Sequence, residues 1–145
     1  MSQSTFSGPV RSQAAFISTG GGVNVEYGAV ATEATAAAVT YTAANLKTGL
    51  ILRNPNGAGR ADLVPTAAAI VAAFPGAVID SWFEFTIRNT AGAAETITVT
   101  TNTGVTLSGT MTIAQSNSKC FRVQFNAVIA GSEAVTIYSL GTVVH

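Results

Sequence analysis

The two residue types that most often carry nucleophilic and acid–base chemistry occur once each, as Cys120 and as His145 at the end of the sequence. A catalytic histidine must be positioned and oriented by its neighbours, so we expect neither a Ser-His-Asp nor a Cys-His site. Cys120 shares the polar phase of its predicted strand with Arg122, and a nearby guanidinium lowers the pKa of a thiol. We nevertheless expect Cys120 to be an ordinary small side chain on a sheet face. A single cysteine also excludes an internal disulfide and a multi-thiolate metal site.

The acidic residues show no spacing that indicates a carboxylate dyad or a calcium loop. They are Glu26, Glu33, Asp62, Asp80, Glu84, Glu95 and Glu133. Glu84 and Arg88 lie on one face of a predicted strand, where we expect solvated or inter-strand ion pairs rather than a catalytic couple. The sequence predicts no catalytic residue, no metal ligand and no cofactor site, and we expect a protein that is not an enzyme.

Residues 54–62 contain Gly57 and Gly59 followed by Asp62, a pattern that superficially suggests a phosphate-binding loop. The third glycine of the dinucleotide motif, the lysine of the P-loop and the following βαβ pattern are all missing. We therefore predict a surface loop between a strand and a short helix, with Asp62 available to bond backbone near the start of that helix.

Trp82 and Tyr138 are candidates for stacking against a sugar ring, because an exposed aromatic face suits a pyranose. Aromatic residues on strands more often pack against a neighbour or a subunit interface. One tryptophan is weak support for a glycan site, so we favour the packing role.

The composition limits the partners. Seven basic and seven acidic residues give a formal net charge of zero, so no long-range field steers the chain onto nucleic acid or an anionic membrane. Only 10% of the residues are charged, against about 25% in soluble domains, and the mean hydropathy is +0.40. The longest apolar run, residues 63–79, contains Pro65, Pro75 and Gly76 and is too short to span a bilayer. We expect burial between subunits to cover this weakly charged surface.

Period-two alternation of apolar and polar residues predicts the strands. Phe83, Phe85 and Ile87 share one face of a strand, and Trp82 and Glu84 share the other. Further strands are predicted at residues 23–27, 38–43, 46–53, 95–101, 105–107, 111–113, 121–125 and 134–140, with a tight hairpin turn at Ser108-Gly109. The spacing of the turn residues favours an antiparallel, jelly-roll-like β-sandwich.

One helix is predicted at residues 66–74, which follow Pro65 and precede Pro75-Gly76. Residues 1–22 are rich in Ser, Gly, Gln and Ala, and the sequence predicts a flexible N-terminal arm followed by a single domain, 23–145. The arm is either simple terminal disorder or a segment that reaches a neighbouring subunit. In the second case the apolar anchors are Phe6, Val10, Phe16 and Ile17. The first residues do not resemble a secretory signal, so we expect synthesis in the cytosol.

Several short stretches resemble the small β-rich virion proteins of tailed bacteriophages, in particular the decoration or cement proteins of phage heads. The stretches are Arg53-Asn54-Pro55 with Gly57, PTAAAIV (65–71), IRNT (87–90), Glu95-Thr96, GVTL (104–107) and GSEAV (131–135). The resemblance covers about residues 44–141 and consists of these short stretches rather than of a chemically diagnostic motif.

The resemblance implies a homotrimer that sits where major capsid subunits meet, on the capsid surface of the virion, and clamps the lattice without metal, cofactor or reaction. From the zero net charge and the short apolar run we expect no partner among nucleic acids or membranes. Two rival functions stay open. One is a tail- or fibre-associated β domain that binds a host glycan, and the other is a cellular carbohydrate-binding module with Trp82 or Tyr138 exposed.

Overall fold

The computed structural model describes residues 29–145. Of these residues 44% lie in strands and 10% in two helices, so the chain is mainly β as predicted. The predicted arm at residues 1–22 and the predicted strand at 23–27 lie outside the described residues. Within 29–145 no helix has the length and hydropathy needed to cross a bilayer.

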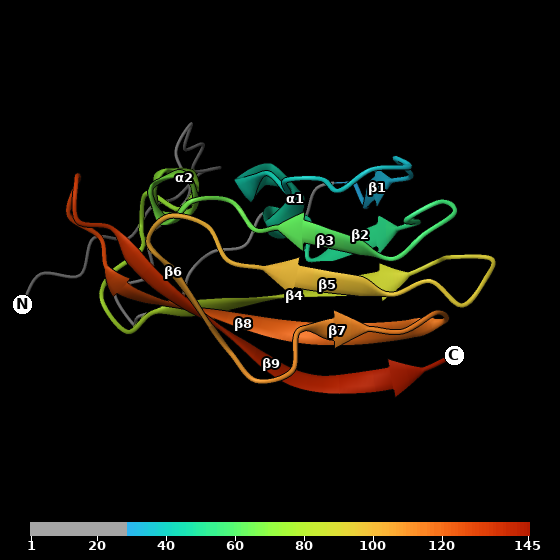
Figure 1. The fold of residues 1–145 in the computed structure, drawn as a ribbon. Helices are drawn as coiled ribbons and strands as arrows, with labels where there is room; N and C mark the ends of the chain where they lie inside the picture. Colours follow the sequence, from blue (N-terminus) through green and yellow to red (C-terminus); the bar gives the residue numbers. More distant parts are fainter. Residues whose placement is uncertain (1–28) are drawn as a thin grey trace, which may run out of the picture.

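The strands form two sheets. In spatial order, the larger sheet contains β1 (Ala31–Glu33), β2 (Leu50–Arg53), β4 (Trp82–Asn89), β8 (Asn117–Ala127), β9 (Ala134–Val144) and β6 (Val105–Ser108). The smaller sheet contains β3 (Arg60–Leu63), β5 (Ile97–Thr100) and β7 (Thr112–Ile113). Figure 1 shows the smaller sheet in front of β4 and β8, with both helices along the upper side of the molecule.

Both sheets are mixed rather than antiparallel throughout. The pairs β4–β8, β8–β9 and β5–β7 are antiparallel, as predicted, whereas β1–β2, β2–β4, β3–β5 and β6–β9 are parallel. Alternation indicates which residues face the core, but it carries no information about the direction of the neighbouring strand. The prediction of a wholly antiparallel arrangement is therefore wrong for these four pairs.

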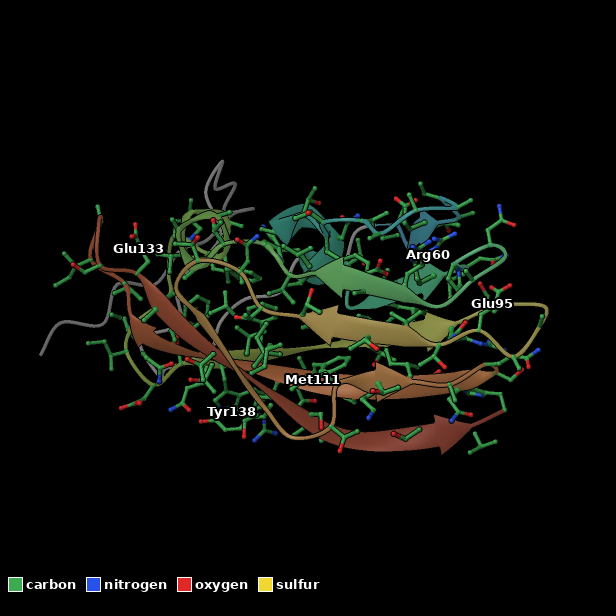
Figure 2. All side chains as sticks on the ribbon, viewed as in Figure 1. Arg60, Glu95, Met111, Glu133 and Tyr138 are labelled. Atoms are coloured by element: carbon green, nitrogen blue, oxygen red, sulfur yellow. The ribbon has the colours of Figure 1, made fainter. Side chains whose placement is uncertain are left out.

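The turn at Ser108-Gly109 is not a hairpin. β6 pairs with β9 in the larger sheet and β7 pairs with β5 in the smaller one, so the chain passes from one sheet to the other after Ser108. Figure 2 shows Met111 on this connection and Tyr138 near the crossing of β6 and β9. Gly109 adopts a positive φ of 95°, and a Cβ atom there would lie 2.7 Å from Ser139 Oγ. Glycine lets the connection pass closely over β9.

The predicted helix is present as α2 (Ala67–Ala73), and Thr66 caps it by accepting a hydrogen bond from the Ala69 N–H. A second helix, α1 (Ala43–Lys47), occupies part of the two segments predicted as strands at 38–43 and 46–53. Thr42 and Asn45 form a reciprocal capping box at its start. This pair of residues is the local signal for helix initiation that alternation alone overlooks.

The core follows the predicted alternation. Phe83, Phe85 and Ile87 of β4 are buried, while Trp82, on the opposite face of the same strand, is half exposed. The same cluster includes inward residues of β8, of the smaller sheet, and of α2 with its C-cap: Phe121, Val123, Phe125, Ile97, Val99, Ile113, Ile70 and Phe74. Phe85 stacks on Phe121 with ring centroids 5.2 Å apart. The two sheets and α2 therefore share a single hydrophobic core.

Candidate interaction face

The outer face of the larger sheet carries a group of polar and aromatic side chains from three adjacent strands. We call it the outer-face patch, and it consists of Trp82, Glu84, Arg122, Gln124 and Tyr138. The register places Trp82 opposite Gln124 and Glu84 opposite Arg122 between β4 and β8. Arg122 in turn lies opposite Tyr138 of β9. All five side chains project from the face opposite the core, because their positions alternate along each strand with those of the buried residues.

Arg122 contacts both an aromatic and an acidic side chain of the patch. Its guanidinium lies over the Trp82 ring at 4.1 Å from the centroid, and its Nε and Nη2 donate to Glu84 Oε1 at 3.0 and 2.6 Å. Both charged side chains are about 40% exposed, so the ion pair adds less than about 1 kcal/mol to folding. The main consequence is geometric: the arginine holds a half-exposed tryptophan in one orientation.

A second chain of hydrogen bonds fixes the other side of the patch. Tyr138 Oη donates to Gln124 Oε1 at 3.1 Å, and Gln124 Nε2 donates to Asp80 Oδ1 at 3.0 Å. Ordered side chains lose less entropy when a partner binds. The patch is therefore a preorganised surface containing Trp, Tyr and Arg, the residue types most often dominant in protein interfaces.

Cys120 lies beside this patch, in the same outward phase as Arg122, as the sequence predicted. Burial and the Glu84 carboxylate raise the pKa of the thiol, and they outweigh Arg122, which lowers it. The thiolate is the reactive form of cysteine. The environment therefore leaves a smaller fraction of Cys120 as thiolate than in a free thiol, the reverse of what proximity to arginine alone suggests.

Asp62 does not lie at the start of a helix. It is a fully buried residue of β3, and it faces Arg53 of β2, which is also fully buried. Arg53 Nε donates to Asp62 Oδ2 at 2.7 Å and Nη2 donates to Oδ1 at 3.2 Å. Tyr41 Oη donates to Oδ2 at 2.9 Å and the Val39 N–H donates to Oδ1 at 3.0 Å. The predicted loop residue thus connects the two sheets.

The remaining donors of Arg53 are also used. Nη1 donates to the carbonyls of Thr35 and Asn54, and Nη2 donates to that of Ala37. An arginine has five N–H donors, and these bonds engage all of them. A fully satisfied and buried pair has no position left for a substrate, so we assign it a structural role.

The glycine-containing loop that we predicted to be an ordinary surface loop bonds to a carboxylate. The Gly57 N–H donates to Glu95 Oε1 at 2.8 Å, and Arg60 Nε donates to the Pro55 carbonyl at 3.2 Å. Figure 2 shows Arg60 and Glu95 at the same end of the molecule, away from Glu133. A carboxylate at the glycine N–H repels a phosphate, which agrees with the prediction of an ordinary surface loop for residues 54–59. The prediction is wrong for residues 60–62, which belong to β3.

The structure brings together a further pair that the sequence analysis did not predict: Ser118 Oγ and His145 Nε2 lie 2.7 Å apart. Histidine needs a third group that orients it before it acts as a base. Among residues 29–145 no carboxylate bonds to His145 and no cluster of three possible metal ligands occurs. The pair fastens His145 to β8, together with the bond from its N–H to the Ser116 carbonyl.

The chain was compared with protein-family models, curated proteins and solved structures, and none of them matches it. The arrangement of its own residues is therefore the basis for a functional proposal. Among the described features, the outer-face patch is the one that combines exposure, fixed geometry and side chains suited to recognition.

Proposed function

We propose that this chain is a structural virion protein that binds the outside of a phage capsid lattice and stabilises it as a cement or decoration protein. The observation that carries the proposal is the outer-face patch, in which Arg122 holds the half-exposed Trp82 in place. The phage part of the proposal rests on the sequence resemblance. In this role the protein is not an enzyme and requires no cofactor.

The partner in this proposal is the major capsid protein. A zero net charge gives neither attraction to nucleic acid nor attraction to an anionic membrane. Recognition then depends on short-range contacts, for which an oriented Trp and Tyr with a polar rim are suited. Synthesis in the host cytoplasm and attachment to the capsid surface complete the proposed location.

The mechanism is linkage between binding and lattice stability. A ligand that binds only the mature lattice stabilises it by RT ln(1 + [L]/Kd) at each site. Repeated sites on one particle act together, so weak individual contacts suffice. The resemblance implies that the protein attaches as a homotrimer, and we include self-association in the proposal.

We also propose a more specific architecture for the two sheets. Two sheets with one shared core favour a β-sandwich. We do not extend this to an antiparallel jelly roll, because β2–β4 and β6–β9 are parallel neighbours in the larger sheet.

The alternative function is a tail- or fibre-associated domain that binds a host glycan. Trp82 is 50% exposed, which favours this alternative, but Arg122 already lies over its ring. A sugar therefore has to use the opposite face of the indole or displace the guanidinium.

The number of copies per particle distinguishes these functions. We expect quantitative mass spectrometry of purified particles to give a ratio to the major capsid protein near one, or a simple fraction such as one third. A handful of copies per particle would support the tail alternative. Absence from particles would contradict both virion roles and leave the cellular carbohydrate-binding module.

Substitution of the patch tests the proposed surface. Trp82→Ala is expected to weaken binding to capsids lacking the protein by about 30-fold per site, the effect of losing an interface hot spot of about 2 kcal/mol. Binding is measured by co-sedimentation at a series of protein concentrations. Ile129→Ala, which removes a 72% exposed side chain from the loop between β8 and β9, is the matched control. Equal binding by both variants and the unmodified chain would exclude the outer-face patch as the capsid contact.

A further inference from the structure

The second half of β9 has a free edge. β6 pairs with β9 only from Val135 to Tyr138, whereas β9 continues to Val144 and pairs on its other side with β8. Within residues 29–145 no strand pairs with the outer side of residues 141–144. In Figure 1 this part of β9 forms the lower border of the molecule, past the point where β6 turns away. We call residues 141–144 the β9 edge.

The register identifies the backbone groups that point outward. The His145 N–H donates to the Ser116 carbonyl, and Val143 and Gly141 lie opposite Ser118 and Cys120 in the same register. Bonded positions alternate along an antiparallel pair, so Gly141 and Val143 bond to β8. The N–H and C=O groups of Thr142 and Val144 therefore face the free side.

The β9 edge lacks the features that usually prevent strand addition. Natural edge strands are blunted by charged side chains, proline or coverage by other elements. Residues 141–144 contain no charge and no proline. Val143 and Val144 are 60% and 77% exposed. An uncharged, apolar edge with outward backbone groups is a template for another extended strand.

We infer that the β9 edge binds the same edge of a second copy of this chain, antiparallel and around a two-fold axis. Placing Val143 on the axis sets Thr142 opposite Val144 of the second copy, and the reverse, so every outward group is used in ~4 backbone hydrogen bonds. An isologous contact of this kind is self-complementary. The zero net charge removes the repulsion that would oppose two identical surfaces.

Strand pairing joins the larger sheets of two copies into one continuous sheet and leaves the outer-face patch free. The contact generates even numbers of copies, namely two, or six where two of the proposed trimers join. Pairing of the β9 edges does not depend on capsid binding. An experiment can therefore contradict this inference without contradicting the proposed function, and the reverse.

Introducing a charge at the axis is the sharpest test. In a non-hydrogen-bonded antiparallel pair the side chains lie directly opposite, with Cβ atoms about 4.5–5.5 Å apart. Val143→Lys and Val143→Glu each place two like charges there, and we expect either variant alone to lose the even-numbered assembly in native mass spectrometry. Mixing the two variants is expected to restore it as a mixed pair. The control Ile129→Lys puts the same charge on an exposed loop residue and is expected to leave the assembly intact.

Hydrogen exchange tests the register in the unmodified protein. The amides of Thr142 and Val144 are expected to become protected as protein concentration rises, whereas those of Gly141 and Val143 are protected at all concentrations by β8. An unmodified chain that is a monomer or an isolated trimer at every concentration overturns the inference. Failure of the mixed variants to assemble overturns the two-fold register, and so does unchanged exchange at Thr142.

Discussion

Asp62→Ala is expected to lower the free energy of unfolding by about 3–5 kcal/mol, the effect of removing one partner from a buried ion pair. The substitution leaves Arg53, which is fully buried, with a positive charge and two unpaired N–H groups. It also removes the acceptor for Tyr41 Oη and for the Val39 N–H. The loss of free energy of unfolding is measured from urea unfolding curves that are fitted with one m-value for both proteins.

Two control variants separate burial of the charge from loss of a contact. Glu84→Ala removes the partner of Arg122, but that pair is about 40% exposed, so we expect a loss below about 1 kcal/mol. The double variant Arg53→Met with Asp62→Leu removes both charges, and we expect it to be more stable than Asp62→Ala alone. Equal losses for Asp62→Ala and Glu84→Ala would contradict the assignment of Asp62 to the core.

The protonation state of Tyr41 is consistent with this buried cluster. Burial, then the Asp62 carboxylate, raises the pKa of the phenol well above its ordinary value of about 10. The phenol therefore stays neutral in the folded chain and serves as a donor to Asp62. A folded-state pKa above the unfolded one gives a contribution to stability that is complete below about pH 10 and decreases as pH rises past it.

Alternation made the inward faces of β4 and β8 predictable. Side chains on a strand alternate strictly between two faces, so Phe83 and Phe85 had to share the core face once the strand was recognised. The same rule placed Trp82 and Arg122 on the outer face. What it could not provide was the cross-strand register, which decides that Arg122 lies over Trp82.

The burial of the Arg53–Asp62 ion pair could not be predicted from the polarity of the sequence. Arg53 and Asp62 belong to the charged residue types, which are almost never fully buried unless paired. The polarity of the sequence alone therefore assigns them to the surface. Their burial depends on β2 and β3 facing each other from different sheets. That contact is tertiary, and no local spacing records it.

The missed elements have similar causes. α1 is five residues long, too short for helical periodicity to be visible against the neighbouring apolar residues. The parallel pairs join strands that are separated along the chain by other elements, as β6 and β9 are. Turn signals between successive strands favour hairpins and carry no record of such distant partners.

Phe85→Ala is expected to lower the free energy of unfolding by about 3–5 kcal/mol, the usual loss for removing a buried phenylalanine. Phe85 is 1% exposed in the central strand β4 and stacks on Phe121 at 5.2 Å. Truncation removes that contact and leaves a cavity between β4 and the smaller sheet, which close-packed neighbours fill only in part. Urea unfolding of the full chain measures the loss.

Trp82→Ala is the matched control, because it removes a larger aromatic side chain from the opposite face of the same strand. Trp82 is half exposed, so its loss is expected to cost far less than that of Phe85. A larger loss for Trp82→Ala would show that the two faces of β4 are reversed. The proposed function adds a second contrast, since binding stabilises only the folded state. Capsid attachment should raise the unfolding midpoint of Phe85→Ala, which retains the outer-face patch, and should do so much less for Trp82→Ala, which loses it.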